Sequence, residues 1–205
     1  MKTIKEIIKQ TLIAIFFTSF TIVLFHLTCN SKVDLVLSLI NKITIIEKKN
    51  IEKEIKFDQV KKRLLEYPEY GTIYATLKIK DLGLELPVYH GDTLDIIKYG
   101  VGHYSGSYFP GEGGSIVLAA HNSKEHFMRL PELKIGANIS IETSYGTFNY
   151  QVTGTKIISD KDEASLPIQN NEEILMMYTC YPMTSYGYKT ERYVVYSKLV
   201  GDKFE

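Results

Sequence analysis

A cysteine late in the chain ends an apolar run that is typical of a buried strand. The run reads ILMMYTCYP, from Ile174 to Pro182, and its Cys180 is one of 2 cysteines among 205 residues. Such a cysteine is either a small buried apolar residue or a nucleophile at a strand end. Because the thiolate is the reactive form and a free thiol has a pKa of about 8.5, a nucleophile needs a base or a cation beside it.

One of the 5 histidines has the sequence context of such a base. In SIVLAAHNS, His121 follows a buried-strand run at the point where the chain turns polar. Strand ends are where rigid folds expose chemical groups. His26 lies in the apolar N-terminal segment, and His90, His103 and His126 are interpreted as packing or surface residues. His121 is therefore the candidate base.

A permanent cation follows on the next strand-like run. Arg192 begins the apolar part of KTERYVVYSKL, which comes after Cys180 across a short loop. If the two runs pair antiparallel, the thiol and the guanidinium lie at the same end of the sheet. A guanidinium there could stabilise a thiolate or donate hydrogen bonds to an oxyanion. The alternative is an ordinary charge at a strand edge.

The N-terminal segment predicts a transmembrane anchor. Residues 1–10 carry Lys2, Lys5 and Lys9, and residues 11–29 carry no formal charge. A helix of that length spans about 28 Å, close to the hydrocarbon thickness of a bilayer, whereas a cleaved signal peptide has a shorter apolar core. Since lysines favour the cytoplasmic side, we expect a single-pass protein of the cell membrane with a cytoplasmic N-terminus and an extracellular domain.

The two cysteines are not expected to pair. Cys29 lies at the outer end of the anchor, and Cys180 lies late in the folded domain. A compartment outside the cell normally pairs its cysteines, so an unpaired cysteine in the outward-facing domain indicates a reactive thiol.

The remaining chain divides into a stalk and a domain. Residues 30–68 repeat apolar residues at helical spacing and then become mixed in charge, which predicts a juxtamembrane helical stalk. Residues 69–205 show short strand-like runs between turn residues, which predicts a mostly antiparallel barrel or sandwich. The expected strands are 71–79, 84–90, 114–121, 138–143, 146–159, 173–180 and 191–200, with short helices at 93–100 and 126–133.

Composition supports a β-rich domain and argues against nucleic acid as a partner. Lys and Arg number 24 and Asp and Glu number 24, so there is no net basic field to attract a polyphosphate. The chain has 15 Tyr and 9 Phe but no Trp, and aromatic residues suit pleated surfaces.

The order LAAH, YTCYP and ERYVV after an N-terminal anchor resembles the sortases, membrane-bound cysteine transpeptidases of Gram-positive bacteria. Their pattern is a strand-end His, then T-L-x-T-C, then an Arg on the following strand. The segments GHYSGSYFPGEGGSIVLAAHNS and FMRLPELKIGANISIET also resemble the family, and the short loop from Cys to Arg is most similar to class D. Met176 and Met177 stand where the family usually has Thr and Leu, a departure that concerns substrate contacts more than chemistry.

The resemblance, which covers roughly residues 70 to 200, implies a closed eight-stranded β-barrel with short helices and a catalytic set of His121, Cys180 and Arg192. It implies cleavage of an LPxTG-like sorting signal between Thr and Gly, and transfer of the Thr carbonyl to an amine of a peptidoglycan precursor. Cys180 as thiolate would form a thioester, His121 would protonate the leaving amine, and Arg192 would hold the oxyanion.

No metal or other cofactor is expected. Residues 160–173, DKDEASLPIQNNEE, carry five acids between two strands and could bind calcium, as some sortases do at a corresponding loop. The acids lack a regular ligand spacing, so a solvated acidic loop is the preferred interpretation.

Two other functions remain open on sequence grounds. A cysteine hydrolase of the cell envelope would release its product rather than join it, but such enzymes usually place Cys before His in the chain and need no Arg. A non-enzymatic anchored β-domain that binds wall polymer would simply bury Cys180. Reaction of the native protein with a thiol probe distinguishes the second from an enzyme.

Overall fold

The computed structural model describes residues 9–10, 13–21, 23, 55–183 and 187–204. The chain forms two compact units, Met1–Glu47 and Lys48–Glu205. In the first unit residues 13–21 are helical, and the hydroxyl groups of Thr18 and Thr21 donate to backbone carbonyls three or four residues earlier. Residues 11–12, 22 and 24–29 of the expected anchor and residues 30–54 of the expected stalk lie outside the described residues. Among the described residues no helix has the length and apolar character needed to cross a bilayer.

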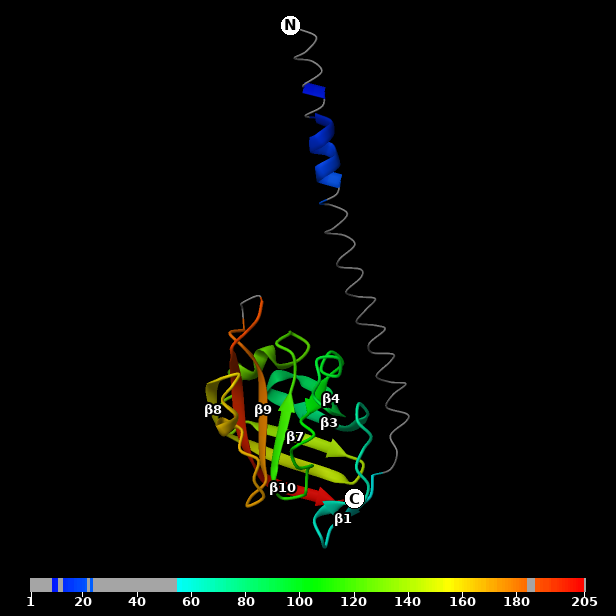
Figure 1. Ribbon diagram of the computed structural model, residues 1–205, viewed down its shortest axis with the longest axis vertical. Helices are drawn as coiled ribbons and strands as arrows, with labels where there is room; N and C mark the ends of the chain where they lie inside the picture. Colours follow the sequence, from blue (N-terminus) through cyan, green and yellow to red (C-terminus); the bar gives the residue numbers. More distant parts are fainter. Residues whose placement is uncertain (1–8, 11–12, 22, 24–54, 184–186, 205) are drawn as a thin grey trace. The chain divides into compact units, whose positions relative to one another are not determined.

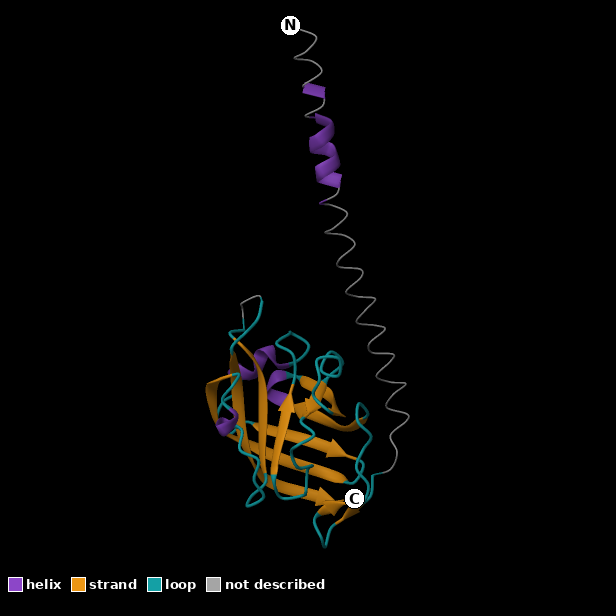
Figure 2. Cartoon of the chain, in the orientation of Figure 1, coloured by secondary structure: helices purple, strands orange, loops and turns teal. Residues whose placement is uncertain are grey.

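The second unit is built on a closed barrel, which confirms the predicted fold class. Its strands follow the order β10-β8-β7-β3-β4-β5-β6-β9, and Figure 2 shows that strands dominate this unit. The barrel strands are β3 (Ile73–Ile79), β4 (Leu84–His90), β5 (Val101–His103), β6 (Ser115–Ala119), β7 (Asn138–Thr143), β8 (Gly146–Ser159), β9 (Ile174–Tyr181) and β10 (Glu191–Phe204).

Alternation along the strands fills the barrel interior. In β8, Phe148, Tyr150 and Val152 are buried in the core, while Asn149 and Thr153 between and beyond them are exposed. This period of two is what a half-buried antiparallel strand requires. The resulting core is a single cluster with members from β3 to β10. Because this core fixes the strands, side chains on the outer face of the barrel have a rigid support.

The strands lie close to the ranges predicted from sequence, and the helices only partly so. A 3₁₀ helix, η2 (Phe127–Glu132), occupies the predicted helical segment 126–133, and two further 3₁₀ turns are η1 (Lys80–Leu82) and η3 (Glu163–Ser165). The expected helix over 93–100 is wrong, because turns occupy residues 94–98. The sequence analysis missed β5, which has only three residues and lies between glycine-rich turns.

The expected helical stalk is also wrong where residues 55–68 are concerned. They form a short antiparallel hairpin of β1 (Phe57–Asp58) and β2 (Arg63–Leu64). Phe57 stacks on Tyr145 and Phe204 at ring-centroid distances of 5.1 and 5.2 Å, and Figure 1 shows β1 beside the C-terminus. These aromatic contacts with the barrel outweigh a weak local preference for helix.

Beneath the loop between β5 and β6 lies a buried histidine, His103, in a closed hydrogen-bond network. Its Nδ1 lies 3.0 Å from the Tyr74 hydroxyl, and its Nε2 lies 2.8 Å from Ser107 Oγ. Ser107 Oγ donates to the Tyr104 carbonyl, so the network assigns the Nε2–H tautomer to His103. Burial, with a smaller contribution from His90, lowers the pKa of His103 to about 3.

The first prediction concerns this buried histidine. Between pH 6.5 and about 3 the unfolded chain binds a proton at His103 that the folded chain excludes. The free energy of unfolding should therefore fall as pH drops below 6.5, by up to about 1.4 kcal/mol per pH unit from this group. Urea unfolding of the protein and of His103→Gln across pH 4 to 8 measures the difference. Equal pH slopes in the two proteins would contradict the assignment.

Candidate active site

The pairing of three strands brings the predicted catalytic residues to one end of the barrel. β6 and β9 are parallel, with Ala119 opposite Tyr178, and β9 and β10 are antiparallel, with Cys180 directly opposite Arg192. His121 lies two residues beyond Ala119 and so continues the register to the level of Cys180. Adjacent strands lie about 4.8 Å apart, so the three residues are neighbours across the sheet.

Alternation also places the three side chains on the same face. Ala120, one residue before His121, and Met177 and Val195, three residues from Cys180 and Arg192, belong to the core, and each is an odd number of positions from the residue it is compared with. Successive side chains point to opposite faces of a sheet, so His121, Cys180 and Arg192 lie on the outer face. Cys180 is free of any disulfide and partly exposed. Met176 and Met177 are both fully buried, which removes them from direct contact with a bound substrate.

His121 is partly buried where the chain leaves β6. Its carbonyl accepts the Phe127 amide at 3.0 Å, which brings the chain back toward η2. Its ring and that of His126 are arranged edge to face, with their centroids 6.3 Å apart. Burial lowers the pKa of His121, and the positive charge of Lys98 lowers it further. The neutral imidazole, which can accept a proton, is thereby favoured.

Asn122 ties the histidine-bearing strand end to the cysteine-bearing one. Its Nδ2 lies 3.0 Å from the Cys180 carbonyl and 3.3 Å from the Met183 carbonyl. Next to it, Thr179 Oγ1 donates to the Ala120 carbonyl at 2.8 Å. Asn122 was not predicted from sequence, although its place directly after His121 was a usable signal. These bonds hold the two strand ends together beyond the last paired residues of β6.

The Arg192 guanidinium is anchored along one edge. Its Nη1 donates to the carbonyls of Lys189 and Glu191, each at 2.8 Å. An arginine fixed in this way can present the rest of its planar fork without a large further loss of side-chain freedom. Arg192 also lines a groove, so its remaining donors can meet a ligand there.

This groove, of about 470 Å³, runs along the outer face of the same strands. Burial raises the pKa of Asp92 and raises the pKa of Tyr178 to about 12, so both groups favour their neutral forms more than exposed residues do. No motif in the sequence marks this lining, so it was not predicted. The groove is lined by Asp92, Tyr104, Val117, Ile158, Ser159, Asp160, Asp162, Leu166, Pro167, Ile168, Tyr178 and Arg192.

The acidic segment between β8 and β9 uses its carboxylates internally. Asp160 accepts from the Tyr188 hydroxyl, and Asp162 accepts from both the amide and the hydroxyl of Ser165. The described residues contain no group of three or more His, Cys, Asp or Glu arranged to hold a metal ion.

Comparison with known proteins assigns the chain to a family. A model of the sortase domain matches residues 77–200, more than half of the chain. Sortase D of Bacillus subtilis is 38% identical over 143 residues, which are 70% of this chain and 72% of that protein.

Solved structures agree with this assignment. A sortase D5 transpeptidase of Clostridium perfringens is 27% identical with a TM-score of 0.60, over 67% of this chain and 84% of that chain. Sortase C of the same species is 29% identical with a TM-score of 0.57, over 65% of this chain and 72% of that chain. The chain therefore belongs to the sortase family of cysteine transpeptidases.

Proposed function

We propose that this sortase cleaves an LPxTG-like sorting signal between Thr and Gly and transfers the Thr carbonyl to an amine of a cell-wall precursor. The observation that supports the proposal is the strand register, which sets His121 and Arg192 at the level of Cys180 on neighbouring strands. Arg192 also lines the groove. A nucleophile, a base and an oxyanion donor are the groups that acyl transfer requires.

The first half-reaction makes a thioester. His121, whose lowered pKa favours the neutral imidazole, takes the thiol proton as the Cys180 sulfur attacks the Thr carbonyl carbon. Arg192 donates hydrogen bonds to the oxyanion that forms. The carbon–nitrogen bond to Gly then breaks, and the His121 imidazolium gives its proton to the departing amine.

The second half-reaction returns the enzyme to its first state. An incoming amine enters the place that the leaving group vacated, and His121 removes its proton as the nitrogen attacks the thioester. The carbon–sulfur bond breaks, and the thiolate of Cys180 recovers the proton from His121. Water can replace the amine, so the lifetime of the thioester and the access of acceptor decide between joining and hydrolysis.

The groove suits the acyl part of such a signal. Val117, Ile158, Leu166 and Pro167 give it apolar walls that match the Leu and Pro side chains. Arg192 lines the same groove, and it is opposite Cys180 in the strand register, so the Thr carbonyl would lie beside it. Four extended residues span about 13 Å, which leaves the Thr carbonyl within reach of Cys180.

We further propose that residues 11–29 anchor the protein in the cell membrane with its domain outside the cell. The support is the uncharged stretch after Lys2, Lys5 and Lys9. Such an anchor keeps the enzyme at the surface where exported substrates and wall precursors meet.

The second prediction tests the nucleophile and the base. Cys180→Ala and His121→Ala should each abolish cleavage of an LPxTG peptide, while the midpoint of thermal unfolding changes little, because both side chains lie on the outer face. Mass spectrometry should detect a thioester on Cys180 and, with added amine, an amide adduct in place of hydrolysed peptide. Cleavage whose product never changes with any wall-type amine would favour the cysteine hydrolase instead.

The third prediction tests how Arg192 acts. Arg192→Lys should lose nearly as much activity as Arg192→Ala, about 10² to 10³ in kcat/KM, because an ammonium keeps the charge but loses the planar fork. Arg129→Lys, at a surface arginine that pairs with Glu132, is the matched control and should remain active. Near-full activity of Arg192→Lys would mean that only the positive charge is needed.

The fourth prediction concerns Asn122 as a positioning residue. In Asn122→Asp the new side chain has almost the same shape as asparagine. Its carboxylate oxygen, however, would face the two carbonyls that accept hydrogen bonds from Asn122 Nδ2. We expect a loss of about 1 to 3 kcal/mol in stability and a fall in kcat with little change in KM. Asn138→Asp, at an exposed asparagine on β7, is the control. Equal kinetics of the two variants would argue against a positioning role.

A further inference from the structure

A second hollow, of about 520 Å³, adjoins the groove. The two hollows share Ile168 as a wall residue. The loop after β5 contributes to both hollows: Tyr104 lines the groove, and Ser105 to Phe109 line the second hollow. We call this second hollow the basic subsite, because Lys62 and Arg63 of the β1–β2 hairpin form one side of it.

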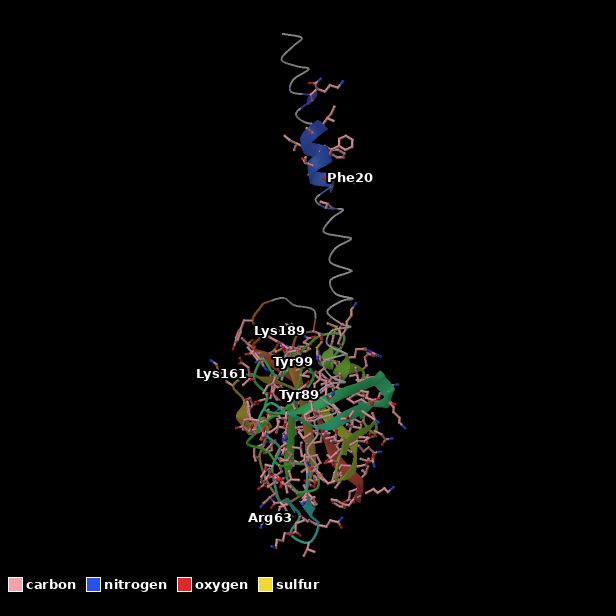
Figure 3. All side chains as sticks on the ribbon, turned by 90° about the vertical axis from the view of Figure 1, so that its right-hand side faces the viewer. Phe20, Arg63, Tyr89, Tyr99, Lys161 and Lys189 are labelled. Carbon is pink, nitrogen blue, oxygen red and sulfur yellow. The ribbon has the colours of Figure 1, made fainter. Side chains whose placement is uncertain are left out.

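The strand register shows in which direction the basic subsite lies from the active site. Along β6 and β9, the pairs run from Ala119 opposite Tyr178 near the active site to Ser115 opposite Ile174. Ser115 accepts the Tyr108 amide, which places the loop of the basic subsite at this far end. Figure 3 shows Lys189, whose carbonyl binds Arg192, and Arg63 at opposite ends of the domain.

The length of this path sets which part of a substrate reaches the subsite. Cys180 and Ile174 are six residues apart on β9, or about 20 Å at roughly 3.3 Å per residue. A peptide with its Thr carbonyl at Cys180 and its Leu three residues earlier covers about half of that distance. The residues about two to five positions before Leu would therefore lie over the basic subsite.

Charge in the subsite is arranged to favour an acidic ligand. The side chains of Lys62 and Arg63 are exposed, so they can meet a ligand. The acid beside them, Glu112, accepts the amides of Leu64 and Phe109 and the Tyr67 hydroxyl, so its oxygens are engaged within the protein although its charge remains. Two cations against this one carboxylate leave the lining with an excess of positive charge.

The wall of the subsite is rigid. Glu173, which is 8% exposed, accepts the amides of Gly111 and Gly113 and the Tyr150 hydroxyl, and so fixes the segment after Phe109 to the start of β9. Leu64, 3% exposed, fixes the hairpin on the other side. The cations are therefore presented from a preformed surface rather than from a loose tail.

Lys62 itself occupies an unfavourable backbone conformation. Its φ is 46°, and among the described residues it is the one non-glycine residue with a positive φ. Gly or Asn adopts this region at lower cost. The turn alone would favour Gly or Asn at this position. A lysine here is consistent with a role for its side chain rather than for the turn.

From the continuity of the two hollows and the charges of the hairpin we propose that this sortase has an extended substrate site, in which Lys62 and Arg63 bind acidic residues upstream of the sorting signal. The proposal rests on the function proposed above and adds a substrate class to it: exported proteins with Asp or Glu shortly before the signal.

The test compares three peptides with the same LPxTG core and different preceding segments, in which the positions two to five before Leu are acidic, neutral or basic. We measure kcat/KM with the full-length protein in detergent at low salt. The acidic peptide should be cleaved about three- to tenfold more efficiently than the neutral one, the size expected for two exposed ion pairs. The preference should shrink at 0.5 M salt.

Charge reversal identifies the residues responsible. Lys62→Glu with Arg63→Glu should bring the acidic-to-neutral ratio to one or below and should make the basic peptide the better substrate, which also shows that the variant is folded and active. Lys80→Glu with Lys134→Glu changes the net charge equally at exposed lysines elsewhere and should keep the acidic preference. Loss of the preference in this control variant as well would trace it to overall charge and overturn the proposal.

Lys62→Gly separates binding from folding. It removes the strained backbone position as well as the cation, so thermal stability should rise while the acidic preference falls. Cleavage of all three peptides at equal rates by the unmodified protein would overturn the extended site and leave the proposed function intact. No cleavage of any of them, with the protein folded, would instead contradict the LPxTG specificity.

Discussion

The parallel pairing of β6 with β9 is the contact on which the rest of this structure depends. It joins segments that are far apart in the chain and sets Ala119 opposite Tyr178, so that His121 and Cys180 emerge at the same level. A slip of one residue in this register would turn Cys180 toward the core, because side chains alternate between the faces of a sheet. The hydrogen bond from Thr179 to the Ala120 carbonyl and those of Asn122 act against that slip.

Two histidines of the barrel domain differ in how deeply they are buried, and their pKa values respond accordingly. The barrel interior holds His103 as a neutral imidazole with both nitrogens engaged, which stabilises the fold but makes it sensitive to acid. On the outer face, His121 is only partly buried, so its pKa is lowered while the ring remains within reach of a substrate. The two histidines therefore differ in burial: His103 is enclosed in the core, whereas His121, the proposed base, remains partly accessible.

Much of the fold could be predicted because period-two alternation is a local signal. The residues of β8, which contains Phe148 and Tyr150, and of β9, which contains Met177 and Cys180, are enough to predict these strands. The hairpin at residues 57–64 was not, since Phe57 takes up its position through rings at Tyr145 and Phe204, far away in the sequence. The three-residue β5 was missed for a related reason: so short a strand exists only because its neighbours β4 and β6 pair with it.

The sequence by itself determined the chemical groups of this sortase: a thiol at a strand end, an imidazole at another, a guanidinium at a third, and the resemblance that joined them. Only the tertiary structure decided their register, the bonds of Asn122 across two strand ends, and the two hollows that share Ile168, one lined by Arg192 and the other by Lys62 and Arg63. The reason is physical. Residue type and alternation are properties of a short segment, whereas a cleft and its charge depend on which distant segments closing the barrel brings together.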